Sequence, residues 1–114
     1  MIRTAAALAA VAVVTAPAAT ASPPIVGGNG LCPNARNLAD YIRNTYAGVQ
    51  SIGGVRADRL PDHPSGHALD IMVGNLGLGD AIAADVRDQA ARFAVKYVLW
   101  KVPHHFDHVH VTVL

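Results

Sequence analysis

A single carboxylate interrupts an otherwise apolar segment of this chain. Residues 68–73 read Ala-Leu-Asp-Ile-Met-Val, a pattern typical of a buried β-strand except for Asp70 at its centre. A carboxylate in such surroundings is costly to bury unless a positive charge or a metal ion compensates it. The fold must therefore bring a compensating group to Asp70.

Histidines elsewhere in the chain are candidates for that group. The chain has six histidines, all between His63 and His110. His63 precedes Asp70 by seven positions in a polar loop, and His108 and His110 alternate on an apolar strand, so both project from the same face. Two imidazoles and one carboxylate on neighbouring strands can form a three-ligand site with an open fourth position, as expected of catalytic zinc.

The N-terminus has the features of an export signal. Arg3 supplies a positive charge, residues 5–16 are small or apolar, and Ala19-Thr20-Ala21 offers a cleavage site before Ser22. The apolar run is shorter than the roughly 20 residues of a membrane span. We therefore predict a signal peptide over residues 1–21, a secreted or cell-envelope location, and no membrane span after cleavage.

Length, charge and cysteine content exclude several classes of protein. The 114 residues allow one small domain, and a formal net charge of +1 provides no basic surface for nucleic acid. A single cysteine, Cys32, excludes a disulfide framework and a cysteine-based zinc finger. We expect a monomer that binds no nucleic acid.

The order of predicted elements indicates an α+β fold. A Pro- and Gly-rich segment, residues 22–31, is expected to be a flexible lead-in, and residues 32–114 to form the domain. Apolar spacing predicts helices over 33–46 and 80–96, and strands over 49–55, 68–73, 97–102 and 108–113. This pattern predicts a small antiparallel sheet with two packed helices and the zinc site on the sheet.

Two motifs together resemble a known family. His63-x-x-Gly66-x-Ala68-x-Asp70, followed by a His-x-His strand, resembles the zinc D-alanyl-D-alanine peptidases of the LAS-type superfamily. These enzymes share a fold with the lysostaphin-type endopeptidases and the hedgehog N-terminal domain. The resemblance is strongest to small secreted actinobacterial domains ending in an Asp-His-Val-His-Val strand, and it covers residues 49–113.

The resemblance implies a role for each residue of the two motifs. It makes His63, Asp70 and His110 the ligands of Zn²⁺. Asp107 falls where the family has its general base. His108 falls where relatives have an outer-shell or transition-state-stabilising histidine.

Other positions extend or depart from the family pattern. Arg56 matches an arginine that steadies the substrate or the developing oxyanion, with Arg59 as a weaker candidate. Relatives often have Ser where this chain has Pro61, and many use Glu as the base, whereas this chain has no Glu. Strand alternation places Asp107 on the face opposite His110 unless a turn or bulge precedes the strand, so His108 is the alternative base.

The function implied is hydrolysis of cell-wall peptides. We expect a secreted zinc peptidase that cleaves peptidoglycan stem peptides or cross-links, with a zinc-bound water as nucleophile. One alternative is a zinc-stabilised module that binds cell-wall peptides without cleaving them. Another is a metal-capture protein with several weaker sites that use His67, His104 and His105.

Overall fold

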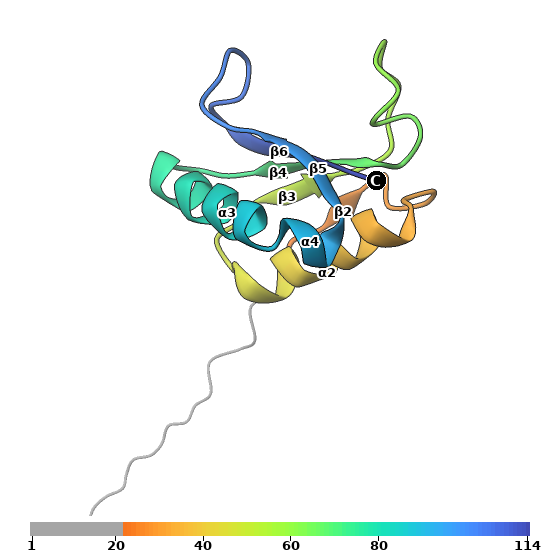
Figure 1. Cartoon of the computed structure of the whole chain (residues 1–114). Coiled ribbons are helices and arrows are strands. Elements are labelled where there is room, and N and C mark those ends of the chain that lie inside the picture. The colour runs from red at the N-terminus through yellow and green to blue at the C-terminus, as the bar shows by residue number, and fades with distance from the viewer. Residues whose placement is uncertain (1–21) are drawn as a thin grey trace, which may run out of the picture.

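One five-stranded sheet organises residues 22–114, the part of the chain that the computed structural model describes (Figure 1). Its strand order is β2-β3-β4-β6-β5, and every neighbouring pair is antiparallel except β2 and β3. The strands are β2 (Ile25–Val26), β3 (Ser51–Gly53), β4 (Ala68–Met72), β5 (Val95–Leu99) and β6 (His108–Val113). The helices α2 (Pro33–Thr45), α3 (Leu76–Asp88) and α4 (Ala90–Phe93) cover one face of the sheet. The predicted α+β class is confirmed.

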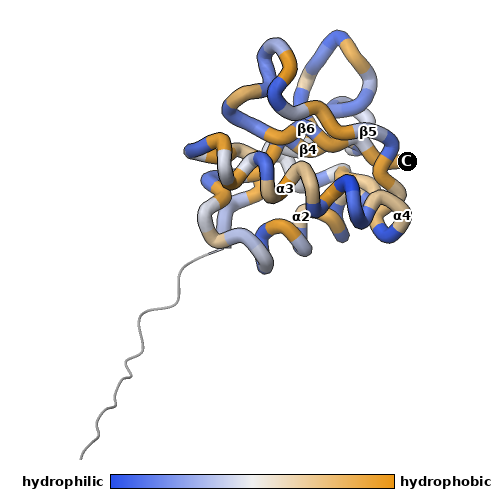
Figure 2. The backbone as a smooth tube through the Cα atoms, turned by 60° about the vertical axis from the view of Figure 1, so that its left-hand side comes forward, coloured by the Kyte–Doolittle hydropathy of each residue, from blue (hydrophilic) through white to orange (hydrophobic). Residues whose placement is uncertain are grey.

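The two central strands separate the core from the opposite face. Successive side chains of β4 and β6 point to opposite sides of the sheet. Leu69 and Ile71 pair with Val111 and Val109 and are fully buried in the core. Asp70 pairs with His110 on the other side. The sheet is thus apolar toward the helices and carries Asp70 and His110 on its other face. Figure 2 shows hydrophobic residues along the central strands β4 and β6.

Helix α2 follows the sequence pattern closely. Pro33 lies at its first position, where a missing N–H costs nothing. Four apolar side chains at helical spacing are fully buried, namely Ala35, Leu38, Ala39 and Ile42. The predicted helix over 33–46 is confirmed to within one residue.

The second predicted helix, 80–96, is wrong at both ends. Helix α3 begins four residues earlier, because the Asn75 side chain accepts a hydrogen bond of 2.8 Å from the Leu78 backbone N–H and caps it. The first turn contains Gly77 and Gly79, which indicated a loop. The helical region also breaks after Asp88, and α4 ends where Ala94 adopts a left-handed conformation with φ of 55°.

Residues 22–31, whose composition predicts a flexible lead-in, contribute a short edge strand to the sheet. Ile25 and Val26 pair in parallel with Ile52 and Gly53, forming the edge strand β2. Two α2 arginines hold this segment: Arg36 donates to the Gly28 carbonyl at 2.6 Å and Arg43 to the Pro23 carbonyl at 2.7 Å. Pairing satisfies backbone groups of β3 that would otherwise lie at the sheet edge.

The predicted signal peptide, residues 1–21, lies outside the described residues. Among residues 22–114, no helix has the length and apolar character needed to cross a bilayer.

A cluster of polar side chains lies between α2 and α3, on the helical side of the sheet, around the carboxylate of Asp85. Asp85 accepts hydrogen bonds from the hydroxyls of Tyr41 at 2.7 Å and Tyr46 at 2.6 Å, and from the Gln89 amide. Burial raises the pKa of Asp85, but these donors outweigh it and the pKa is lowered. Burial and the same contact raise the pKa of Tyr46.

Replacing this carboxylate is expected to give a pH-dependent loss of stability. Because the folded-state pKa of Asp85 is lowered, its contribution is full above the unfolded pKa of about 4 and is lost as the pH falls through the folded value. Asp85→Asn should lower the free energy of unfolding by about 1–2 kcal/mol at pH 7. Urea denaturation at several pH values should show that the difference in the free energy of unfolding between wild type and Asp85→Asn becomes smaller in acid. A difference of the same size at pH 3, or an equal loss in the exposed Asp88→Asn control, would contradict this role.

Candidate metal centre

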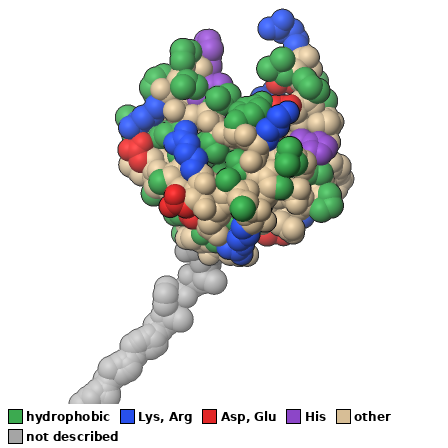
Figure 3. Space-filling model, viewed as in Figure 1, with side chains coloured by type: hydrophobic (Ala, Val, Ile, Leu, Met, Phe, Trp, Pro, Cys, Tyr) green, Lys and Arg blue, Asp and Glu red, His purple; other side chains and the backbone are tan. Residues whose placement is uncertain are grey.

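Two loops project from the sheet face opposite the helices and enclose a pocket of about 280 Å³. One loop connects β3 to β4 and the other connects β5 to β6 (Figure 1). Figure 3 shows the hollow between them, with histidine side chains on one wall. The pocket is lined by Arg56, Asp58, Leu60, Asp62, His63, Asp70, Tyr97, Leu99, His104, His105, His108 and His110.

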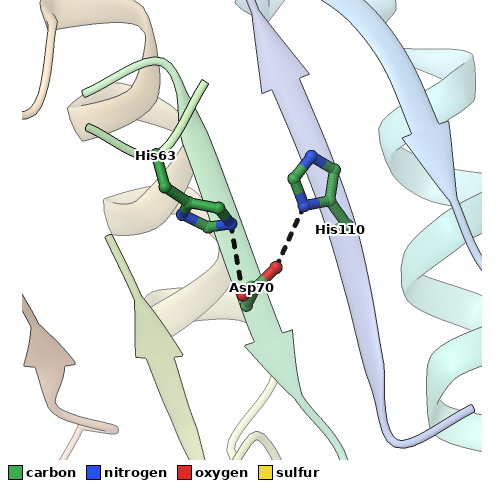
Figure 4. Close-up of side chains that lie close together, drawn as sticks. All are labelled: His63, Asp70 and His110. Carbon is green, nitrogen blue, oxygen red and sulfur yellow. Dashed lines mark hydrogen bonds and ion pairs between the residues drawn. The ribbon is translucent and has the colours of Figure 1, made fainter. Parts of the chain in front are cut away.

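Three of the sequence-predicted residues meet at the base of this pocket (Figure 4). Strand register places Asp70 of β4 directly opposite His110 of β6, and the β3–β4 loop carries His63 back over the sheet. Asp70 Oδ2 lies 3.2 Å from His63 Nε2, and Asp70 Oδ1 lies 3.0 Å from His110 Nδ1. All three residues are buried, and their candidate ligand atoms lie within 4.8 Å of one another. This group could hold a metal ion.

In His63 and His110, the ring nitrogen that faces away from Asp70 makes a hydrogen bond that holds the imidazole. His63 Nδ1 lies 2.9 Å from the Gly54 carbonyl oxygen, to which it donates, and His110 Nε2 lies 2.8 Å from Thr112 Oγ1. With its N–H on that outer nitrogen, a neutral ring can offer the nitrogen that faces Asp70 to a metal ion; in the structure, His110 Nδ1 is hydrogen-bonded to Asp70 Oδ1 at 3.0 Å. Such outer hydrogen bonds are the usual way in which proteins orient histidine ligands of metals.

The surroundings of one buried atom indicate whether these three side chains fit a cation. His63 Nε2 is inaccessible to solvent and makes no hydrogen bond within the described residues, although Asp70 Oδ2 lies at ion-pair distance. A buried polar atom without a partner is rare in native proteins and is costly. A metal ion bound between this nitrogen, Asp70 and His110 Nδ1 would satisfy it. The residues therefore fit a metal ligated by two nitrogens and an oxygen.

Hydrogen bonds and basic neighbours keep Asp70 ionised. Burial alone raises the pKa of this carboxyl, but the His110 hydrogen bond, the nearby His63 and His108, and Arg56 together hold it well below its ordinary value. Asp70 is therefore available as an anionic ligand at neutral pH.

The glycine of the first motif has a steric role. Gly66 has a φ of +81°, and a Cβ at this position would lie 2.1 Å from the Gly30 carbonyl oxygen. The Gly66 carbonyl also accepts a hydrogen bond from the Cys32 backbone N–H at 3.0 Å. Only glycine allows this close approach, which packs the loop that carries His63 against the start of α2.

Asp107 lies beside the centre, not within it. It precedes β6, its side chain is 75% exposed, and its Oδ1 lies 2.7 Å from His108 Nδ1. The other nitrogen of His108, Nε2, points into the site and lies 3.7 Å from Asp70 Oδ1. The hydrogen bond with His108 lowers the pKa of Asp107. The geometry thus places the imidazole between the Asp107 carboxylate and the three-residue group.

Arg56 contacts the group directly. Its guanidinium lies 3.2 Å from Asp70 Oδ2 and 3.4 Å from Asp58 Oδ2, and half of its side chain is exposed to the pocket. Arg59 belongs to the same loop but not to the residues that line the pocket. Of the other histidines, His104 and His105 line the pocket, whereas His67 is hydrogen-bonded to Ser65 outside it.

Three residues of the site were not predicted from the sequence. Asp62 Oδ2 accepts hydrogen bonds from Thr112 Oγ1 at 2.9 Å and from the Tyr97 hydroxyl. The Tyr97 ring stacks on His110, with centroids 5.8 Å apart and planes 17° from parallel. Thr112 follows His110 by two positions on one strand, and that spacing was the one available signal. The positions of Asp62 and Tyr97 depend on long-range packing.

Fold and site together define an α+β domain with a buried His-Asp-His group that could hold a metal. The chain belongs to the family described as VldE, C-terminal domain, whose model matches residues 27–105. That match includes Arg56, His63 and Asp70 and ends before β6. No curated protein and no solved structure matches the chain. The likeness to zinc D-alanyl-D-alanine peptidases therefore stays a prediction from the motifs.

Proposed function

We propose that this protein is an exported zinc-dependent peptidase that cleaves peptide bonds of bacterial peptidoglycan. The observation that carries the proposal is the buried His63, Asp70 and His110 group, in which His63 Nε2 makes no hydrogen bond among residues 22–114, in a partly enclosed pocket. Two imidazoles and one carboxylate suit zinc and leave a fourth position for a reacting molecule. The motif resemblance supports cell-wall peptides as the substrate class.

The metal and the protein have separate roles in this chemistry. Zinc, when bound, lowers the pKa of a bound water and polarises the scissile carbonyl. The protein supplies the ligands, a base, and groups that orient the substrate. In a partly enclosed pocket, hydrogen bonds to developing charge are stronger than in water.

His108 is the side chain placed to accept and return a proton. Its Nε2 faces the His63, Asp70 and His110 group, and its Nδ1 lies 2.7 Å from the Asp107 carboxylate. A carboxylate behind an imidazole fixes the ring and stabilises the imidazolium that forms on proton transfer. Asp107, initially expected as the base itself, therefore acts through His108 in this proposal.

Arg56 is placed to bind the substrate. Its planar guanidinium can pair with a carbonyl oxygen that gains charge, or with a substrate carboxylate, in a fixed geometry. Its contact with Asp70 holds it near the scissile bond, and its exposed half faces the pocket. Leu60 and Tyr97 add apolar surface to the same walls.

Metal content and peptide cleavage test the function together. The protein from residue 22 onward should bind one zinc ion per chain and release amino groups from purified peptidoglycan; a chelator should abolish release and zinc should restore it. Stoichiometric zinc without cleavage would favour the binding-module alternative. Titration to several comparable zinc ions would favour metal capture. Absence of zinc binding would overturn the proposal.

Removing each member of the Asp107–His108 pair should separate their roles. His108→Ala should keep zinc and lower the turnover number by about 100-fold or more, the usual contribution of a general base. Asp107→Ala should also keep zinc and lose turnover, but by a smaller factor, because the imidazole is still present.

The two variants should be compared at equal zinc content with a soluble cell-wall peptide. Asp88→Asn, on the helical side of the sheet, provides a control for loss of one surface carboxylate. A larger loss in Asp107→Ala than in His108→Ala would identify Asp107 as the base and contradict the assignment to His108.

A further inference from the structure

We propose that Asp62 is a positioning residue that orients the metal ligand His110 through the hydroxyl of Thr112. This inference rests on the proposed metal site and adds to it a residue that neither the motifs nor the family match assigns. Asp62 comes from the β3–β4 loop, whereas His110 and Thr112 lie on β6. The three side chains form a continuous chain of hydrogen bonds.

The chemistry of these groups determines the direction of each hydrogen bond. An ionised carboxylate can only accept, so the single hydroxyl proton of Thr112 is donated to Asp62 Oδ2 at 2.9 Å. Thr112 Oγ1 then has only lone pairs to offer His110 Nε2, at 2.8 Å. His110 therefore donates to Thr112 through an N–H on Nε2, and Nδ1 is the nitrogen that faces Asp70 Oδ1, at 3.0 Å, and that could ligate a metal.

Without Asp62, this direction is no longer imposed. The Thr112 hydroxyl could rotate and donate to Nε2, so that the only N–H of a neutral His110 ring would lie on Nδ1, committed to its hydrogen bond with Asp70 Oδ1 at 3.0 Å. An Nδ1–H bonded to Asp70 would block two of the three ligands. The Asp62 carboxylate thus favours the form of His110 that can bind a metal.

Through Tyr97, Asp62 makes a second contribution to the position of the His110 ring. Its hydroxyl donates to Asp62 Oδ2 while its ring stacks on His110. A bulge between Val95 and Tyr97 in β5 shifts the register so that Tyr97 pairs with Thr112. Bulges are a common means of redirecting a side chain next to a functional site. The ring is therefore held at its edge by Thr112 and at its face by Tyr97.

Asp62 also couples the two histidine ligands. It immediately precedes His63, so one short loop segment supplies one ligand and orients another on β6. Thr112 is 1% exposed, so water cannot readily replace its hydroxyl in this role. A movement of this loop would therefore disturb both imidazoles.

Zinc affinity measured by competition with a chromophoric chelator provides the test. Thr112→Val, which keeps the side-chain shape but removes the hydroxyl, should weaken zinc binding by about 10- to 100-fold, the usual effect of losing an outer-shell partner. Asp62→Ala should weaken it within the same range. Thr112→Ser should keep near-wild-type affinity. Asp58→Ala removes a carboxylate that lines the same pocket without contacting His110 and should change affinity by less than about 3-fold.

The double variant decides whether Asp62 acts through Thr112. If it does, Asp62→Ala combined with Thr112→Val should weaken zinc binding by clearly less than the product of the two single-variant factors, because both changes break the same hydrogen-bonded path. Fully additive losses in binding free energy would show that Asp62 acts independently of Thr112 and would overturn the inference. Unchanged affinity in Thr112→Val, in a variant whose melting temperature shows that it is folded, would also overturn it. If the wild-type protein binds no zinc, both the inference and the proposed function fail.

Discussion

Asp70→Asn is expected to weaken zinc affinity by more than about 100-fold, the upper end of the effect of removing a residue that only supports a metal ligand. Asp70 is the one anionic member of the buried group and lies between the two histidine nitrogens, 3.2 Å from one and 3.0 Å from the other. An amide of the same size has no negative charge, and its N–H₂ group can occupy the space of the cation. Zinc content after dialysis, and the dissociation constant by chelator competition, would measure the loss.

Companion variants distinguish a metal centre from a set of ion pairs. His63→Ala and His110→Ala should each lose zinc to a comparable extent, whereas Asp58→Asn, at the pocket wall, should keep it. If Asp70→Asn binds zinc within 10-fold of wild type, the three residues are not the ligands. Thermal melts with and without zinc would show that the variants are folded, because bound metal stabilises the native state.

Gly79→Ala is expected to be the most destabilising small substitution in α3. A Cβ at this position would lie 2.1 Å from two carbon atoms of the Trp100 indole, which is 7% exposed. The indole cannot shift freely, because its Nε1 donates to Asp80 Oδ1 at 2.8 Å. Overpacking of this kind should lower the free energy of unfolding by about 2–3 kcal/mol.

The same helix offers a matched control. A Cβ at Gly77 would meet only Asn75 Oδ1, at 3.4 Å, so Gly77→Ala should be neutral or should stabilise the protein by up to about 0.5–1 kcal/mol through helix propensity. Trp100 is the only tryptophan of the chain, so its fluorescence reports directly on the displaced indole. Equal stability of the two variants in urea denaturation would contradict the packing argument.

The candidate metal-binding group was largely predictable because its signals are local. An apolar strand with one aspartate needs a compensating partner, and alternation on the last strand puts His108 and His110 on one face. The α+β order and helix α2 were predictable for the same reason, since periodicity is a property of neighbouring residues. The early start of α3 was not predicted because Gly77 and Gly79 favour a loop locally. The Asn75 cap is a local signal that could have indicated this start, whereas the packing of Gly79 against Trp100 exists only in the fold.

The sequence alone determined which residue types can bind a cation and which of them share a strand face. The tertiary structure decided which of those residues meet. Register brought Asp70 opposite His110, and the β3–β4 loop brought His63 and Asp62 over the sheet. It also placed Asp107 behind His108 and paired the edge strand β2 with β3. The physical reason is that side-chain alternation is set within a strand, whereas register, bulges and loop positions depend on contacts between residues far apart in the chain.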